Sequence, residues 1–159
     1  MPKPDAAVTG ELQKLAPELV AIVTAMPLPE LDVGPLHAPL AKWLKTDAGA
    51  LNELQKCGLL LLSGQLDASH EISQSIHSPE GSFWHGIMHR REGDFWNAKY
   101  WFRKVGKHPV LAHLAETKYG DGSVFVDRVE QAIQSHTPDL QACRELQWKE
   151  WQALFRHTL

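Results

Sequence analysis

Cysteine is scarce in this chain. Its 159 residues include only Cys57 and Cys143, and both lie in apolar stretches with helical periodicity. Two cysteines are too few for a disulfide scaffold or a zinc finger. We therefore expect both to be reduced residues of the hydrophobic core.

Long apolar runs are also missing. Runs such as the four leucines at 59–62 are far shorter than the ~20 residues of a membrane-spanning helix. The N-terminal sequence MPKPDAAVTGELQ lacks the apolar core of a secretory signal. These absences favour a soluble, cytoplasmic protein that does not enter a membrane.

Two common catalytic signatures are absent as well. The stretch YGDGS at 119–123 lacks the strand and the lysine of a phosphate-binding loop, and no G-x-S-x-G motif of a serine hydrolase occurs. No segment alternates between polar and apolar residues with the hairpin turns that strands require. The periodicity that is present is helical, which predicts an all-α protein.

The helical segments predict about seven helices, arranged as stacked antiparallel hairpins. With 43% apolar residues, the chain is long enough for one compact domain, which we assign to residues 9–159. Prolines near the start of the chain predict a flexible tail over residues 1–8, with Thr9 as the first helix cap. The last helix is expected to be capped by Thr137, followed by a proline at its first position.

One segment, residues 83–109, concentrates the chemically active side chains. It holds three of the nine histidines, seven of the 13 aromatic residues and six of the 16 lysines and arginines. Residues 83–107 carry a charge of +4, whereas the whole chain carries −3. A local basic and aromatic segment in an acidic protein favours a small anionic ligand or a peptide over nucleic acid.

Two helix pairs in the middle of the chain are similar at an offset of 29 residues. When Gly64 is aligned with Gly93, Cys57 falls opposite Gly86. The second pair resembles the tetratricopeptide pattern in its glycine, alanine and aromatic positions, but it lacks the early tryptophan and the ~34-residue period. We therefore expect tetratricopeptide-like hairpins rather than a tetratricopeptide protein.

A polar stripe crosses this second pair. The spacing of His85, His89 and Glu92 places them on one side of a helix, and the tetratricopeptide-like alignment turns that side toward the partner helix. Polar side chains in such a position must pair with one another, with the neighbouring helix or with a ligand. The pattern fits hydrogen-bonded core histidines as well as a binding site.

The same segment resembles the motif HAxxHRxEGDxxNAxYWYRRxG, which is found in a family of small helical proteins from bacteria and some fungi. The likeness covers roughly residues 55–115, and the matching positions are His85, His89, Arg90, Glu92, Gly93, Asp94, Asn97, Ala98, Tyr100, Trp101, Arg103 and Gly106. Gly86 replaces an alanine of the motif and Phe102 replaces a tyrosine, so any role of a hydroxyl at 102 does not carry over. The resemblance implies a helical fold and assigns no activity.

One interpretation of the segment is a binding module without turnover. The walls of its pocket would be the aromatic residues Trp84, Trp96, Tyr100 and Trp101. Arg90, Arg91 or Arg103 would meet a carboxylate or phosphate through a bidentate fork. The ligand-binding residues would be His70, His85, His89, Arg90, Glu92, Asp94, Asn97, Tyr100, Trp101 and Arg103. This interpretation predicts a small anionic molecule or a peptide as the partner.

The alternative is a metal-dependent, hydrolase-like enzyme. His85 and His89, four residues apart on one helix, can chelate a divalent transition metal, and His70 from the preceding hairpin would be the third ligand. Three protein ligands leave one position for a reactive water. The glutamate base of zinc proteases is replaced here by glycine. A metal-free acid–base pair of His89 with Glu92 or Asp94 is a further alternative.

A structural or interaction role is the third class of function. The C-terminal sequence ELQWKEWQALF carries Trp148, Trp151 and Phe155 at helical spacing. Such a stripe closes the end of a helical stack, or it forms a homo-oligomer or partner contact where it stays uncovered.

Overall fold

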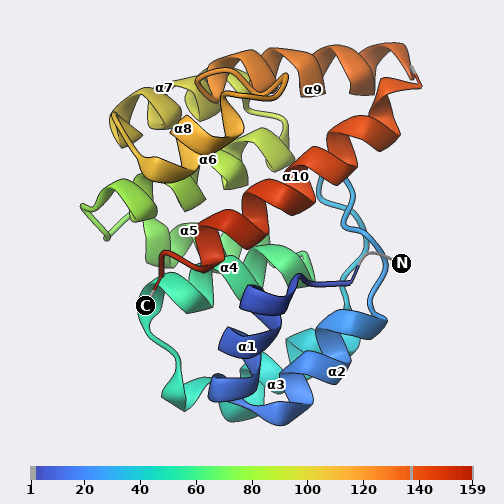
Figure 1. The fold of residues 1–159 in the computed structure, drawn as a ribbon, viewed down its shortest axis with the longest axis vertical. Coiled ribbons are helices and arrows are strands. Elements are labelled where there is room, and N and C mark those ends of the chain that lie inside the picture. Colours follow the sequence, from blue (N-terminus) through green and yellow to red (C-terminus); the bar gives the residue numbers. More distant parts are fainter. Residues whose placement is uncertain (1–2, 137, 159) are drawn as a thin grey trace.

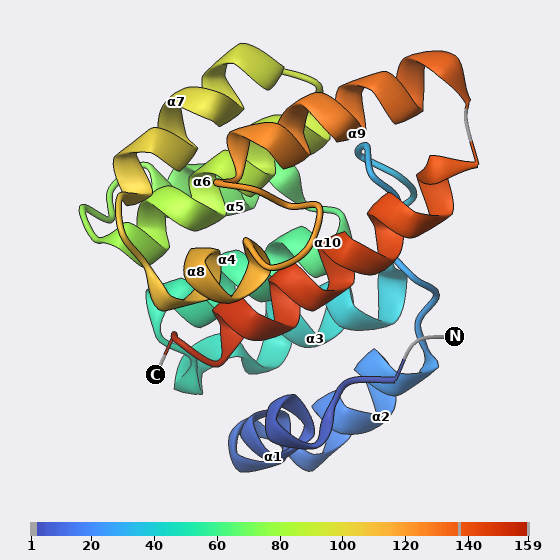
Figure 2. The same cartoon turned by 45° about the horizontal axis from the view of Figure 1, so that its top comes forward.

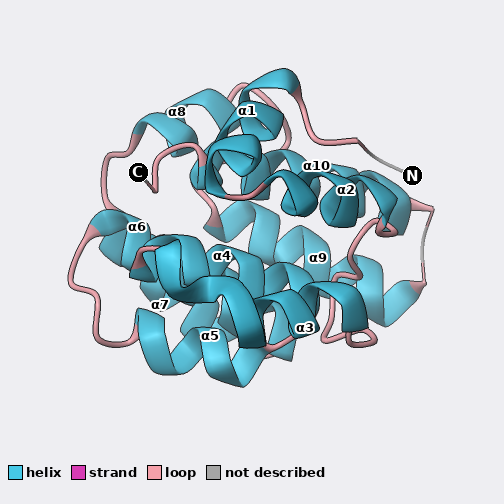
Figure 3. Ribbon diagram, turned by 90° about the horizontal axis from the view of Figure 1, so that it is seen from below, coloured by secondary structure: helices cyan, strands magenta, loops and turns pink. Residues whose placement is uncertain are grey.

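The computed structural model describes residues 3–136 and 138–158, so the predicted cap Thr137 lies outside the described residues. Over these ranges the protein is all-α, without a strand (Figure 3), which confirms the predicted fold class. The elements are α1 (Ala6–Leu15), α2 (Pro17–Ala25), α3 (Ala38–Asp47), the 3-10 helix η1 (Ala48–Ala50), α4 (Glu53–Ser63), α5 (Leu66–Ser73), α6 (Pro79–Glu92), α7 (Phe95–Val105), α8 (Pro109–Leu114), α9 (Ser123–Ser135) and α10 (Asp139–Phe155).

The described chain has more helices than the seven or so that the sequence predicts, in part because a proline divides the first predicted helix. Proline has no N–H to donate, and it disfavours helical backbone in the residue before it. Ala16 accordingly has an extended backbone, with φ −165° and ψ 130°. Helix α1 therefore ends at Leu15, and α2 starts at Pro17.

The N-terminal segment is attached to the body of the protein. Helix α1 begins directly after Asp5, inside the predicted tail of residues 1–8, and Val8 is fully buried. Asp5 rather than Thr9 caps the helix, because its carboxylate accepts a hydrogen bond from the N–H of Val8 at 2.9 Å. The N–H of Asp5 in turn donates to Gln152 of α10 at 2.7 Å. Residues 5–8 therefore pack against the rest of the protein.

The helices form three groups along the long axis of the molecule. Helices α1–α3 lie at one end, α7–α9 lie at the other, and α4–α6 lie between them (Figure 1). Helix α10 runs diagonally across the molecule and contacts α9, α8 and α4 (Figure 1, Figure 2). The last helix therefore connects groups that the chain builds earlier.

The two central hairpins have equivalent turns. Gly64 ends α4 and Gly93 ends α6, each in the left-handed conformation with φ of +88° and +87°. In both turns the next N–H donates to the carbonyl five residues earlier, Gln65 to Leu60 and Asp94 to His89, each at 2.9 Å. Only glycine adopts this conformation without strain, so both glycines are required to reverse the chain.

Helix α6 is the centre of the fold. Every residue from Gly81 to Arg91 is buried, although the helix carries two histidines and two arginines in that stretch. A helix that is buried on all sides has to provide partners for each polar group. The polar side chains of α6 therefore decide which segments pack around it.

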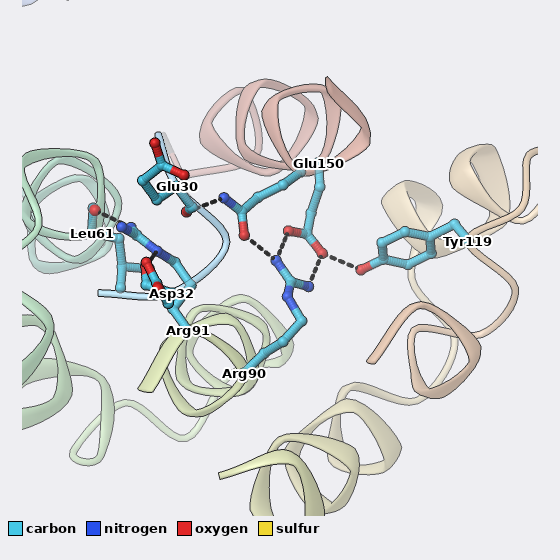
Figure 4. A network of polar contacts seen from close by, with 8 residues as sticks. Glu30, Asp32, Leu61, Arg90, Arg91, Tyr119 and Glu150 are labelled. Carbon is cyan, nitrogen blue, oxygen red and sulfur yellow. Dashed lines mark hydrogen bonds and ion pairs between the residues drawn. The ribbon is translucent and has the colours of Figure 1, made fainter. Parts of the chain in front are cut away.

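Arg90 connects α6 to α10 through a buried ion pair. Its guanidinium donates to both carboxylate oxygens of Glu150, at 2.8 and 2.6 Å, and to the side-chain oxygen of Gln147 at 3.1 Å (Figure 4). The hydroxyl of Tyr119 donates to Glu150 as well. Burial, with Glu150 alongside, raises the pKa of Tyr119 well above its ordinary value, which keeps the hydroxyl protonated and able to donate.

Arg91 faces another direction and holds the proline-rich connector between α2 and α3. Its Nε donates to the carbonyl of Asp32 at 3.1 Å, and one terminal nitrogen donates to the carbonyl of Leu61 (Figure 4). The other terminal nitrogen donates to the carbonyl of Val33 at 3.1 Å. Gln147 contributes a further hydrogen bond to the carbonyl of Glu30 at 3.0 Å. These side chains satisfy backbone carbonyls that an irregular segment cannot pair internally.

The aromatic stripe of α10 is covered by the chain itself. Trp148, Trp151 and Phe155 are 7%, 5% and 1% exposed, and the indole of Trp151 donates to the carbonyl of Gly58 at 2.8 Å. These side chains therefore close the helical stack from within and are not available as a surface contact.

Two further sequence expectations concern cysteine and membranes. Cys57 and Cys143 are both free and buried, as predicted. Among the residues that the structure describes, no helix is both long enough and apolar enough to cross a membrane.

Replacing Glu150 by alanine is expected to destabilise the protein by about 3–5 kcal/mol, because it leaves the Arg90 charge buried without a partner. Urea unfolding measures this loss. The control is Glu145→Ala, at an exposed position of the same helix, which should change the unfolding free energy by no more than about 0.5 kcal/mol.

The double variant Arg90→Met with Glu150→Leu removes both charges together. It should recover most of the lost stability, since no buried charge remains unpaired. Equal stability of Glu150→Ala and Glu145→Ala would contradict this account of the ion pair.

Candidate metal centre

Three histidines from two helices meet at one point. His70 lies in α5, and His85 and His89 lie on successive turns of α6. Their ring centroids are 4.7 Å (His70–His85), 5.3 Å (His70–His89) and 4.8 Å (His85–His89) apart. Each ring offers a nitrogen, and these nitrogens lie within 4.8 Å of one another. The two-hairpin arrangement therefore brings together the three residues that the sequence suggests as metal ligands.

Two of the three rings are deeply buried. His85 is 3% exposed and His89 is 7% exposed, whereas His70 is half-buried at the edge of the cluster. The Nδ1 atom of His85 is buried and has no hydrogen-bond partner within the described parts of the chain. A buried polar atom without a partner costs about 1–3 kcal/mol. The cluster thus contains a donor or acceptor that the surrounding protein does not satisfy.

A carboxylate fixes the orientation of His89. Its Nδ1 lies 2.6 Å from Glu92, so this nitrogen carries the proton that is donated to the carboxylate and Nε2 is left with its lone pair. Asp94 lies 4.0 Å from the same nitrogen and accepts a hydrogen bond from the Asn97 side chain at 3.1 Å. A ligating histidine held by a carboxylate in this way is typical of metal sites.

Aromatic rings on α7 cover one side of the cluster. Trp101 stacks on His85 with ring centroids 3.8 Å apart, and Tyr100 meets Trp101 edge to face at 5.3 Å. The Lys104 ammonium lies 5.5 Å from the Tyr100 ring and 5.7 Å from the Trp101 ring. Trp101 is therefore a wall of the site, as the sequence analysis suggests.

The environment keeps His85 neutral. Burial, with smaller contributions from the neighbouring His89 and His70, lowers its pKa from 6.5 to about 3. A neutral imidazole retains the lone pair that a metal requires, and no proton has to be displaced from it at neutral pH.

Several residues of the predicted anion pocket lie elsewhere. Arg90 and Arg91 are committed to Glu150 and to backbone carbonyls, so neither is free to bind a ligand. Trp84 is fully buried in the core, whereas Trp96 is 75% exposed. Arg103 lines a different cavity on the other side of α7. The predicted combination of histidines with arginines therefore does not occur at this site.

The charges that do lie beside the histidines are negative. Glu92 and Asp94 both approach the Nδ1 atom of His89. Two carboxylates at the edge of the histidine cluster favour a cation over an anion. The donor set is suitable for a divalent transition metal.

Glu150 and Lys107 are two polar residues of the structure that the sequence analysis did not identify as important. Glu150 follows its partner Arg90 by 60 residues, and no local spacing connects them. Lys107 lies two residues beyond the end of α7, after Gly106, and its place in the basic segment 83–107 is the one signal that could have identified it.

Comparisons with protein-family models, with curated proteins and with solved structures return no match for this chain. The resemblance to the helical family with the histidine motif therefore stays a prediction, and the proposals below depend on the geometry alone.

In metal-free protein, the free energy of unfolding should fall as the pH is lowered from about 6.5 toward 3. The unfolded chain protonates His85 over this range while the folded chain does not, so acid favours unfolding, by up to about 1.4 kcal/mol per pH unit. Urea unfolding across this range, after chelator treatment, measures the slope. His85→Leu should reduce it, whereas the exposed control His77→Gln should leave it unchanged. An unchanged slope in His85→Leu would contradict the assignment.

Proposed function

We propose that this protein binds one divalent transition metal ion through His70, His85 and His89. The observation that carries the proposal is the convergence of three imidazole nitrogens, from α5 and α6, within 4.8 Å of one another. Imidazole is a preferred ligand of zinc, copper, nickel and iron, and three histidines form one of the known catalytic zinc ligand sets.

A modest movement of the rings would complete the coordination. Metal–nitrogen bonds of about 2.0–2.1 Å in a tetrahedral site bring ligand nitrogens to about 3.4 Å from one another. The His85 and His89 rings are nearly parallel, at 21°, and would tilt toward each other, whereas His70 already meets them at 72° and 69°. Rotation about side-chain bonds supplies this movement without a change in either helix.

The surroundings of the cluster support a metal more than an organic anion. Glu92 orients His89 as carboxylates orient metal-bound histidines. His85 carries a buried nitrogen without a hydrogen-bond partner in the described structure. No arginine takes part in the cluster, so the anionic ligand expected at these residues has no bidentate partner there.

Metal-dependent hydrolysis is the second candidate function, and the number of ligands favours it. Three protein ligands leave a fourth position, and His70 lies half-buried at the edge where water can reach the site. A metal held by His70, His85 and His89 would lower the pKa of a bound water toward neutrality and would so supply a nucleophile.

We also infer that the α4–α5 and α6–α7 hairpins are two copies of a tetratricopeptide-like unit. The equivalent glycine turns at Gly64 and Gly93 support this inference. In such a stack the second helix of one hairpin lies beside the first helix of the next, which is the junction where His70 meets His85.

Elemental analysis of untagged protein, dialysed without chelator, is expected to find one equivalent of a divalent transition metal. His70→Ala, His85→Ala and His89→Ala should each lose most of it, because two imidazoles bind a metal far more weakly than three. His77→Ala and His113→Ala, at exposed histidines, are the matched controls and should retain it.

Cobalt titration tests the same site independently of the metal acquired during expression. The intense visible absorption of tetrahedral cobalt should appear in the wild type and be missing in the three site variants. Metal-free protein that binds neither cobalt nor zinc, or equal loss in the exposed-histidine controls, would refute the metal site.

Replacing Glu92 by glutamine should weaken metal binding 10- to 100-fold, because the carboxylate no longer orients His89 or increases its basicity. Competition with a chromophoric chelator measures the affinity. Glu71→Gln, an exposed carboxylate next to His70, is the control and should change the affinity much less. Equal effects of the two substitutions would show that Glu92 acts only through its charge.

A further inference from the structure

A cavity lies on the opposite side of α7 from the histidines. Its volume is about 640 Å³, within the range of small-molecule sites. It is lined by Phe102, Arg103, Gly106, Lys107, His108, Pro109, Leu111, Ala112, Ala115, Gly120, Asp121 and Ser123. These residues come from the end of α7, from α8, and from the loop that leads into α9.

The shape of the cavity is determined by a close backbone contact. Gly122, with φ of +93°, lies so near Phe102 that a Cβ atom would be 2.6 Å from its ring. Only glycine allows the loop before α9 to pack against α7 in this way. Phe102, Leu111, Ala112 and Ala115 then provide an apolar surface.

The polar wall of the cavity is rigid. His108 is 7% exposed, its Nε2 lies 3.0 Å from Glu80, and its Nδ1 accepts a hydrogen bond from the N–H of Val110 at 3.1 Å. Both ring nitrogens are therefore occupied. His108 shapes the cavity and does not supply a free charge to it.

Two cations at the cavity form no ion pair with the residues that the structure describes. Arg103 and Lys107 are exposed, and neither forms an ion pair with any described residue. The carboxylate of Asp121 also lines the cavity, but it accepts hydrogen bonds from the hydroxyl of Ser123 at 2.6 Å and from the N–H groups that start α9. These bonds hold the pKa of Asp121 below its usual value and engage its charge within the loop.

We propose that this cavity binds a small amphipathic carboxylate, with its apolar part against Phe102 and Leu111 and its carboxylate against Arg103 and Lys107. The apolar surface favours a ligand with an apolar body, and the two cations without an ion pair in the described structure favour a negatively charged head group. The site is separate from the proposed metal site, because the histidines and this cavity lie on different faces of α7.

Octanoate is the probe, and calorimetric titration of the full chain measures its binding. We expect saturable binding of one equivalent, with amide resonances of residues 102–123 shifting in heteronuclear NMR spectra. Octanamide, which has the same chain without the charge, should bind at least tenfold more weakly, which corresponds to about 1.4 kcal/mol.

The double variant Arg103→Gln with Lys107→Gln tests the charged contacts. It should weaken octanoate binding at least tenfold and leave octanamide binding unchanged. Both positions are exposed, so the fold is preserved. Ala112→Trp, which places a large ring in the cavity, should prevent binding of both probes.

Each alternative outcome overturns the proposal. No binding of octanoate, equal affinity for octanoate and octanamide, shifts confined to residues outside 102–123, or wild-type affinity in the double variant would each exclude the site. His89→Ala, which tests the metal centre, should leave octanoate binding unchanged, so that either proposal can fail independently.

Discussion

A polar helix in the middle of an all-α protein is the constraint on which this structure depends. Helix α6 is enclosed from Gly81 to Arg91, yet it carries groups that cannot be left without partners. Arg90 binds α10 through Glu150, and Arg91 binds the backbone carbonyls of the proline-rich connector. Since neighbouring helical residues point about 100° apart, successive polar side chains of α6 are directed to different neighbours. The packing of the domain follows from how these groups are satisfied.

The same constraint divides the polar side chains of residues 83–109 between two sites. Both arginines of α6 are bound to other parts of the fold. The histidines of α6 therefore have carboxylates as their charged neighbours and no arginine. Arg103 and Lys107, which form no ion pair in the described parts of the chain, lie near the end of α7 and just beyond it, beside an apolar cavity. We thus assign a cation to the histidine cluster and an anion to the cavity, with α7 as the wall between them.

The sequence predicts those features that depend on local spacing. The helical class, the glycine turns and the common face of His85 and His89 all follow from patterns within about thirty residues. What it does not predict depends on the packing of distant segments. Arg90 and Arg103 are equally basic in the sequence. Only the ion pair with the distant Glu150 makes Arg90 a buried structural residue. Trp84 and Trp96 differ in the same way, since burial depends on which helix lies opposite.

The separation of Arg90 from Glu150 along the chain has a consequence for biosynthesis. A ribosome releases the chain from its N-terminus, and Glu150 is made 60 residues after its partner Arg90. Until α10 leaves the exit tunnel, α6 cannot be enclosed without leaving a charge buried and unpaired. The central hairpins therefore wait for α10 before they reach their final packing, and a transcript truncated before α10 encodes a chain that cannot complete its core.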